Sequence, residues 1–238
     1  MTTEGGTNAP LPARSPNGGG SVRFEVPGGA ITGDLTVPVG AIGIVVFAHG
    51  SGSGRTSPRN TRVARELERS RIATLLLDLL TGEESTVDAE TRRYRFDVPR
   101  LATRLVAVID ALSQWGNTAE LPVGLYGAST GGAAALDAAA ARPLRVAALV
   151  LRGARSDLAG PTVYAVRAPT LFLVGELDPE VRRWNEETRS AMSAPTELQV
   201  LRGAGHLFEE AGALDEVAAR TNAFFRTWLT RSRWEVPR

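Results

Sequence analysis

A serine, an acidic residue and a histidine each follow an apolar stretch of the chain, and together they could perform nucleophilic catalysis. Ser129 lies within Gly-Ala-Ser-Thr-Gly, Asp178 within Gly-Glu-Leu-Asp-Pro, and His206 at the end of Gly-Ala-Gly-His. A serine hydroxyl attacks efficiently only when a neighbouring base removes its proton. That base needs an acceptor that fixes its tautomer and stabilises its cation. The order serine, acid, histidine therefore predicts a catalytic triad assembled from three strand ends.

The residues around Ser129 predict a very tight turn between a strand and a helix. The apolar run from Val123 leads into the turn, and an alanine-rich segment follows it directly. Gly127 and Gly131 lack the side chains that would collide at such a turn. Ser129 would then project in front of a helix N-terminus, whose partial positive charge favours a developing oxyanion. An ordinary tight turn is the alternative interpretation, and the partners found later in the chain argue against it.

The base and the acid differ in how firmly the sequence assigns them. The chain has only two histidines, and His206 alone follows the serine. Asp178 is the preferred acid, although Asp-Pro is also a good helix start with the aspartate as N-cap. Asp157 and Glu176 stay open as alternative acids.

The loop after the early apolar run at 41–48 is a candidate for the other half of the site. Its sequence His49-Gly50-Ser51 can bring backbone N–H groups close to a ligand. We expect the backbone of Ser51 and of Thr130 to form the oxyanion hole. Four further residues at strand ends or helix starts are possible pocket residues, although salt bridges, caps or loop contacts would also explain them: His49, Arg59, Asp78 and Arg152.

The remaining elements must hold these loops at one edge of a sheet. Apolar runs at 41–48, 72–78 and 170–174 are typical of strands buried on both faces. Amphipathic or capped segments predict helices near 57–71, 97–115, 180–192 and 214–229. The alternation predicts a mostly parallel central sheet covered by helices on both faces. Two strands at 21–26 and 30–38 predict an antiparallel hairpin at one edge, and 79–94 is predicted to be irregular.

Composition narrows the function classes. The 238 residues have 43% hydrophobic and 22% charged side chains and a net charge of +1, which gives no support for nucleic acid or a membrane as partner. The chain has neither cysteine nor lysine, which excludes disulfides, a cysteine nucleophile and a Schiff base. We expect a disordered tail at 1–20, a single domain at 21–238, no cofactor or metal, and a cytoplasmic location.

Several motifs in order resemble one family. HGSGSG with SPRN, LLLDLLT, GLYGASTGGAAAL, SDLAG, APTLFLVGELD and GAGHLFEE resemble the dienelactone-hydrolase-like branch of the α/β-hydrolase superfamily. They are closest to hydrolases that in some bacteria are fused to a phosphoribosyltransferase domain. The resemblance implies the α/β-hydrolase fold with a minimal cap, Ser129 as nucleophile, Asp178 as acid and His206 as base. Dienelactone hydrolases proper carry cysteine where this chain has Ser129, which favours general ester hydrolysis.

The sequence therefore predicts a serine hydrolase that acts on a small-molecule ester through an acyl-enzyme. An acyltransferase or cofactor-free perhydrolase would use the same triad and is the first alternative. A non-catalytic ligand-binding protein on the same fold is the second. Residues 79–96 and 153–166 are the only candidates for a short lid, and the oligomeric state cannot be predicted.

Overall fold

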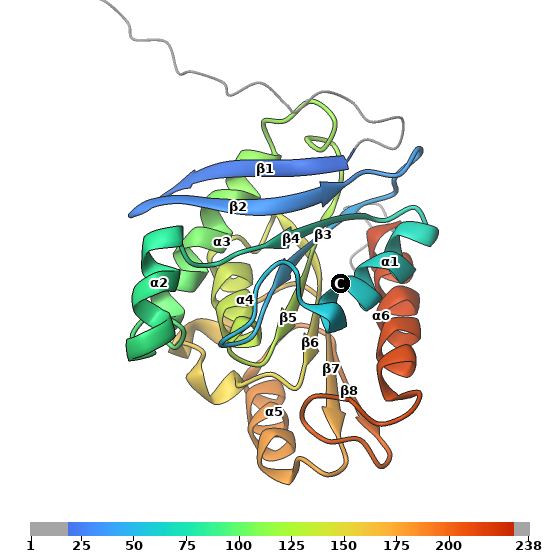
Figure 1. The fold of residues 1–238 in the computed structure, drawn as a ribbon. Helices are drawn as coiled ribbons and strands as arrows, with labels where there is room; N and C mark the ends of the chain where they lie inside the picture. Colours follow the sequence, from blue (N-terminus) through green and yellow to red (C-terminus); the bar gives the residue numbers. More distant parts are fainter. Residues whose placement is uncertain (1–18, 231–238) are drawn as a thin grey trace, which may run out of the picture.

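The computed structural model describes residues 19–230. These residues form an eight-stranded sheet in the order β1-β2-β4-β3-β5-β6-β7-β8 (Figure 1). Neighbouring strands run parallel from β4 to β8, and only β1 and β2 run antiparallel to their neighbours. The bounds of the strands are β1 Gly19–Val26, β2 Gly29–Thr36, β3 Ile44–Ala48, β4 Ala73–Leu77, β5 Val123–Ala128, β6 Val146–Arg152, β7 Thr170–Gly175 and β8 Thr196–Leu201.

The predicted hairpin is confirmed at one edge of the sheet. β1 begins at Gly19, so Gly19 and Gly20, which were predicted to belong to the tail, pair with β2 instead. The rest of the predicted tail, residues 1–18, lies outside the described residues, as do residues 231–238. The central strands β3, β4 and β5 are buried along their whole length, because helices cover both of their faces.

Helices cover the sheet in two groups. α1 (Pro58–Arg69) and α6 (Ala213–Leu229) pack together on one face, and α3 (Val98–Leu112) and α4 (Thr130–Ala141) pack on the other (Figure 1). α5 (Pro179–Ala191) packs on β7 beside two 3₁₀ turns, η1 (Ser156–Leu158) and η2 (Pro161–Ala165). The expected mostly parallel sheet with helices on both faces is confirmed.

One prediction for the segment after β4 is wrong. Residues expected to be irregular contain a helix, α2 (Gly82–Thr91). Thr81 and Glu84 form a capping box, in which each side chain accepts the other residue's backbone N–H. The spacing Thr-x-x-Glu indicates the start of this helix. The segment was nevertheless predicted to be irregular because its composition is polar.

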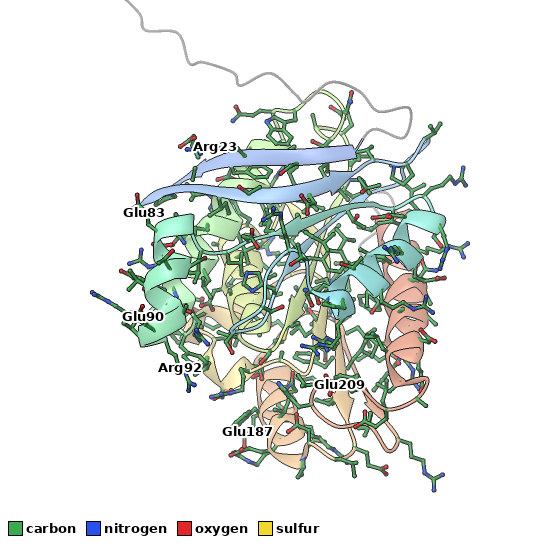
Figure 2. The ribbon with its side chains drawn as sticks, in the orientation of Figure 1. Arg23, Glu83, Glu90, Arg92, Glu187 and Glu209 are labelled. Carbon is green, nitrogen blue, oxygen red and sulfur yellow. The ribbon has the colours of Figure 1, made fainter. Side chains whose placement is uncertain are left out.

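Several charged side chains lie on the outside of the molecule. The residues labelled in Figure 2 are all exposed: Arg23, Glu83, Glu90, Arg92, Glu187 and Glu209. Among residues 19–230 there is no helix with the length and apolarity that a membrane span requires.

Candidate active site

Ser129 stands at the junction of β5 and α4 with an unusual backbone conformation. Its φ of 50° and ψ of −122° lie in a region that costs an L-residue about 1–3 kcal/mol. The glycines beside it make this turn possible. A Cβ atom on Gly131 would lie 2.3 Å from the carbonyl oxygen of Ala48, and one on Gly127 would lie 2.6 Å from Cα of Gly132. The turn thus needs glycine on both sides of Ser129.

The structure places the side chains of Ser129, His206 and Asp178 in one chain of hydrogen bonds. Nε2 of His206 lies 3.2 Å from Oγ of Ser129, and its Nδ1 lies 2.6 Å from Oδ2 of Asp178. Because a carboxylate only accepts, Nδ1 carries the proton and Nε2 is free to accept from the serine hydroxyl. The side chain of Asp178 is 16% exposed and that of His206 is 37% exposed, so the imidazole remains accessible from solvent. This arrangement can deprotonate a serine.

Three acidic residues were candidates for the acid of the triad, and they differ in their contacts. Asp178 occupies the N-cap position of α5, but its side chain makes no capping hydrogen bond. Asp157 receives two hydrogen bonds of 2.8 Å from Arg155. Glu176 accepts from the backbone N–H of Gly203. Of the three candidate acids, only Asp178 contacts His206.

The loop after β3 lies against the serine. A Cβ atom on Gly50 would lie 3.1 Å from Cβ of Ser129, so the backbone of this loop passes directly beside the nucleophile. Ser51 lines the same cavity as Ser129. Thr130 is the first residue of α4, where the N–H has no acceptor within its own helix. Both predicted oxyanion donors therefore lie next to the serine.

His49 joins two loops. Its Nε2 accepts from the backbone N–H of Leu79 at 3.0 Å, and its Nδ1 lies 2.9 Å from the carbonyl oxygen of Gly50. Burial lowers the pKa of His49, which keeps the ring neutral and able to accept at Nε2. These contacts match the expectation that His49 holds neighbouring loops.

A cavity of about 160 Å³ contains the reactive side chains. Arg59 and Arg152, both predicted as possible pocket residues, line it together with Ser129 and His206. Asp78 does not line it and instead pairs with Arg55. Gly50 and Ser51 of the predicted oxyanion loop also line it, and four lining residues were not predicted because no motif marks them: Ser53, Ser57, Asn60 and Leu207.

A second cavity of about 220 Å³ lies on the α2 side of the oxyanion loop. It shares Gly50, Ser51 and Ser53 with the first cavity, so the two are neighbours. Leu80, Ala89 and Leu101 give it an apolar lining, and Ser85, Asp88 and Arg95 stand beside them. Of the two candidate lid segments, only 79–96 borders these cavities, since no residue of 153–166 lines either one.

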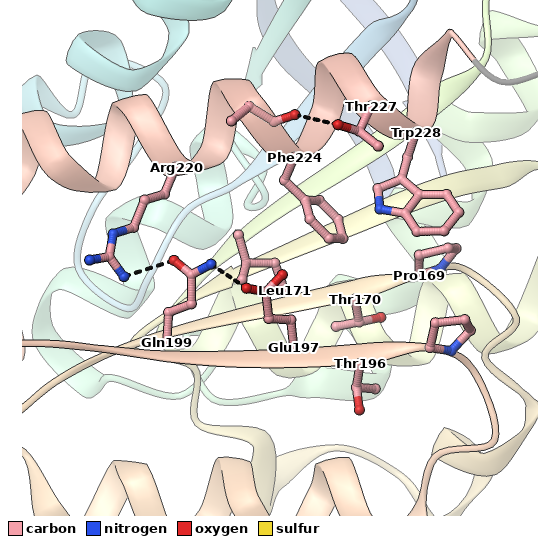
Figure 3. Close-up of a pocket in the computed structure, with 12 residues that line it drawn as sticks. Pro169, Thr170, Leu171, Thr196, Glu197, Gln199, Arg220, Phe224, Thr227 and Trp228 are labelled. Carbon is pink, nitrogen blue, oxygen red and sulfur yellow. Dashed lines mark hydrogen bonds between the residues drawn. The ribbon is translucent and has the colours of Figure 1, made fainter.

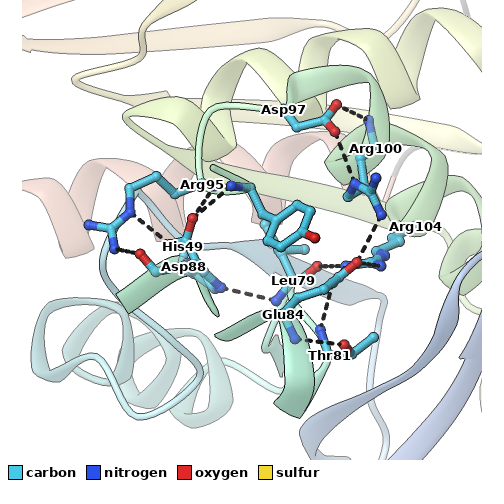
Figure 4. A network of polar contacts seen from close by, with 10 residues as sticks. His49, Leu79, Thr81, Glu84, Asp88, Arg95, Asp97, Arg100 and Arg104 are labelled. Carbon is cyan, nitrogen blue, oxygen red and sulfur yellow. Dashed lines mark hydrogen bonds and ion pairs between the residues drawn. The ribbon is translucent and has the colours of Figure 1, made fainter. Parts of the chain in front are cut away.

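Buried ion pairs hold the wall formed by α2 in place (Figure 4). Glu84 receives two hydrogen bonds from Arg104, at 2.5 and 2.7 Å, and one from Arg100 at 2.8 Å. The side chain of Arg104 is completely buried and also donates to the carbonyl oxygen of Leu79. Burial alone would raise the pKa of Glu84, but its hydrogen bonds from Arg104 and Thr81 outweigh this and lower it.

A further hollow of about 440 Å³ lies between α6 and the start of β7 and β8 (Figure 3). Arg220 donates to Gln199 there, and Gln199 donates to Glu197. This hollow faces the opposite ends of the strands from Ser129 and contains none of the predicted site residues. Within residues 19–230, no group of three or more histidine, cysteine or acidic side chains could hold a metal ion.

The strand order and the serine, histidine and aspartate at the strand ends define an α/β hydrolase. Comparison with known families agrees, because residues 41–223 match the family described as alpha/beta hydrolase domain. The chain belongs to this family, in its dienelactone-hydrolase-like branch.

Two solved structures and one further relative are similar to this chain. A dienelactone hydrolase from Anabaena variabilis is 47% identical, with a TM-score of 0.86 over 88% of this chain and 97% of that one. Est1E from Butyrivibrio proteoclasticus, with a TM-score of 0.74 over 89% and 100% of the two chains, shares the fold at 15% identity. A putative phosphoribosyl transferase of Mycobacterium tuberculosis is 49% identical over 79% of this chain, which spans only 42% of that relative. The matches support a hydrolase.

Proposed function

We propose that this protein is a serine hydrolase that cleaves carboxylic esters through an acyl-enzyme. The observation that carries the proposal is the row of hydrogen bonds from Ser129 through His206 to Asp178, with distances of 3.2 and 2.6 Å. His206 takes the hydroxyl proton while Oγ of Ser129 bonds to the ester carbonyl carbon. The backbone N–H groups of Ser51 and Thr130 hold the oxyanion that forms.

The second half of the reaction regenerates the serine. His206 gives its proton to the leaving alcohol as the carbon–oxygen bond breaks, which leaves an acyl group on Ser129. A water molecule then attacks the acyl carbon, and His206 accepts the proton of that water. The acid leaves, the proton returns to Ser129, and all atoms of ester and water appear in the acid and the alcohol.

The position of the base indicates where the two halves of the ester bind. The leaving oxygen must lie near Nε2 of His206, which protonates it, so the alcohol lies in the 160 Å³ cavity that His206 lines. The acyl group then extends past Ser51 into the α2-side cavity, which His206 does not line. Its 220 Å³ and its apolar residues Leu80, Ala89 and Leu101 suit a short, uncharged acyl chain.

The names of the relatives differ in the activity that they give. The dienelactone hydrolase, which is 47% identical, is named for hydrolysis, whereas the mycobacterial relative is named as a phosphoribosyl transferase. We attribute that second name to the part of the relative that this chain does not cover, because the matched residues carry the hydrolase family. Transfer of the acyl group to an alcohol or to peroxide on the same serine is the alternative reaction, and product analysis distinguishes it.

The test uses p-nitrophenyl acetate and butyrate with a fluorophosphonate probe. Ser129→Ala should lose turnover of both esters and labelling by the probe. Ser190→Ala removes an exposed hydroxyl on α5 and serves as the matched control, with both activities retained. Full turnover by the Ser129→Ala variant would refute the proposed mechanism.

A further inference from the structure

The part of the catalytic cavity nearest α1 contains two arginines and a helix N-terminus. Ser57 and Asn60, the N-cap and the third residue of α1, line it, so the helix presents its N-terminal end to the space beside Ser129. Arg59 and Arg152 line the same space. A helix N-terminus and a guanidinium group both attract negative charge.

Arg152 is buried without a counter-ion. It is 6% exposed, and its Nε atom is buried without a hydrogen-bond partner. Its Nη1 donates to the carbonyl oxygen of Leu207 over a long 3.4 Å, and its guanidinium lies 5.6 Å from the ring centre of Phe208. Among residues 19–230 no carboxylate lies within 4 Å of it. Arg104, which is equally inaccessible, has Glu84 as its partner.

A buried cation without a partner is costly, so such a group points to a ligand that supplies the missing charge. The neighbouring Tyr126 does not supply it, because burial raises the pKa of its hydroxyl more than the adjacent Arg152 lowers it, so the hydroxyl stays neutral. Arg59 uses Nη1 for Glu209, but its Nε is also buried without a partner. The unused donors come from two separate elements, α1 and the end of β6.

We propose that this side of the cavity binds a phosphate group carried by the alcohol half of the ester. The proposal rests on the proposed function, because His206 and Arg152 line one cavity and the alcohol must lie on the side of His206. A planar carboxylate is satisfied by the fork of one arginine. Donors that approach from α1 and from β6 suit a tetrahedral phosphate, for which a helix N-terminus is also a suitable site.

The first experiment compares three acetate esters of similar size: 2-acetoxyethyl phosphate, 3-acetoxypropanoate and 2-methoxyethyl acetate. Release of acetate gives kcat/KM for each. We expect the phosphate ester to exceed the neutral ester by about tenfold or more, since hydrogen bonds to charged groups contribute that much. Arg152→Gln and Arg59→Gln should each reduce this preference. Arg62→Gln, on the outer side of α1 where Arg62 pairs with Asp215, is the matched control and should keep it.

The second experiment does not require turnover. The Ser129→Ala protein is titrated with inorganic phosphate while Tm is followed, with chloride at equal ionic strength as control. With a Kd near 1 mM, about 10 mM phosphate should raise Tm by about 3 °C. The rise should be absent when Arg152→Gln or Arg59→Gln is added. Arg59 is partly exposed, so Arg59→Gln keeps this test available if Arg152→Gln does not fold.

The outcomes separate the two proposals. If Ser129→Ala retains turnover, ester hydrolysis by this serine is wrong, while the Tm titration still decides whether phosphate binds. Equal kcat/KM for the phosphate and the neutral ester, with no Tm change, overturns the phosphate site and leaves the hydrolase intact. A preference for the carboxylate ester over the phosphate ester overturns the assignment to phosphate.

Discussion

Asp178 holds the N-cap position of α5, yet its carboxylate lies 2.6 Å from Nδ1 of His206 and caps nothing. An aspartate at this position ordinarily accepts a backbone N–H from the first turn of its helix. The bond would come from the N–H of the second or third helical residue, Glu180 or Val181, and the Asp178 side chain accepts from neither. The side chain is thereby left for the histidine of a loop 28 residues further along the chain.

Asp178→Asn is expected to lower activity without lowering stability. The amide would no longer fix His206 with its proton on Nδ1, and loss of this function in a triad costs about 10⁴-fold in kcat. Because no capping bond is lost, the free energy of unfolding should change by less than about 1 kcal/mol, the usual value of a cap. Ester turnover and urea unfolding measure the two effects. A large loss of stability with modest loss of turnover would show a structural role instead.

Gly131→Ala should disrupt the turn that presents Ser129. The new Cβ atom would lie 2.3 and 2.4 Å from the carbonyl oxygens of Ala48 and His49, which belong to the buried backbone of β3 and its loop. We expect a loss of about 3 kcal/mol or more in the free energy of unfolding. Gly82→Ala, at a helical position with open space around it, is the matched control and should be neutral or slightly stabilising. Equal stability of the two variants would contradict the tight turn.

Glu84→Gln should loosen α2. The substitution leaves Arg104 completely buried without its counter-ion, and breaking a buried pair from one side costs about 3–5 kcal/mol. The pKa of Glu84 is lowered in the folded state, so its contribution is present above its unfolded pKa of about 4.3 and is lost as the pH falls below that value. The difference from the wild-type protein, measured by urea unfolding, should therefore shrink below pH 4. Glu83→Gln, on the exposed neighbour, should show little difference at either pH.

His49 makes stability depend on pH near neutrality. Burial lowers its folded pKa, whereas in the unfolded chain it takes up a proton near pH 6.5. The unfolded state then binds more protons, so stability falls as the pH drops below 6.5, by up to about 1.4 kcal/mol per pH unit. His49→Gln keeps an acceptor for the N–H of Leu79 and should remove this part of the slope. Identical pH profiles of unfolding free energy for both proteins would show that folding does not lower the pKa of His49.

The repeated apolar strands and the order of Ser129, Asp178 and His206 made the fold predictable. A strand buried on both faces is almost entirely apolar, and the loops at His49, Ser129 and Asp178 directly follow such strands. The loop at His206 follows the less buried edge strand β8. The parallel arrangement then brings the loop tips to one edge, whatever their separation along the chain. Such local patterns predict the fold correctly because the tertiary contacts favour the same strands and helices.

The parts that escaped prediction depend on contacts between distant segments. α2 was missed because the polar composition of its segment outweighed the capping box of Thr81 and Glu84. The missing counter-ion of Arg152 could not be foreseen, since an arginine at a strand end gives no sign of which acids approach it. The position of α2 likewise involves a contact between separate segments, the hydrogen bonds from Arg104 on α3 to Glu84.

The order of the strands along the chain has a consequence for biosynthesis. A chain leaving the ribosome has produced β3, β5 and the turn at Ser129 long before His206, which follows the edge strand β8. Domains generally fold as synthesis proceeds from the N-terminus, so the half of the site around the nucleophile can form first. Under the proposed mechanism, the hydroxyl of Ser129 lacks its base until β8 joins the sheet beside β7. We therefore expect that, in a translation reaction, turnover of p-nitrophenyl acetate begins only after β8 has docked.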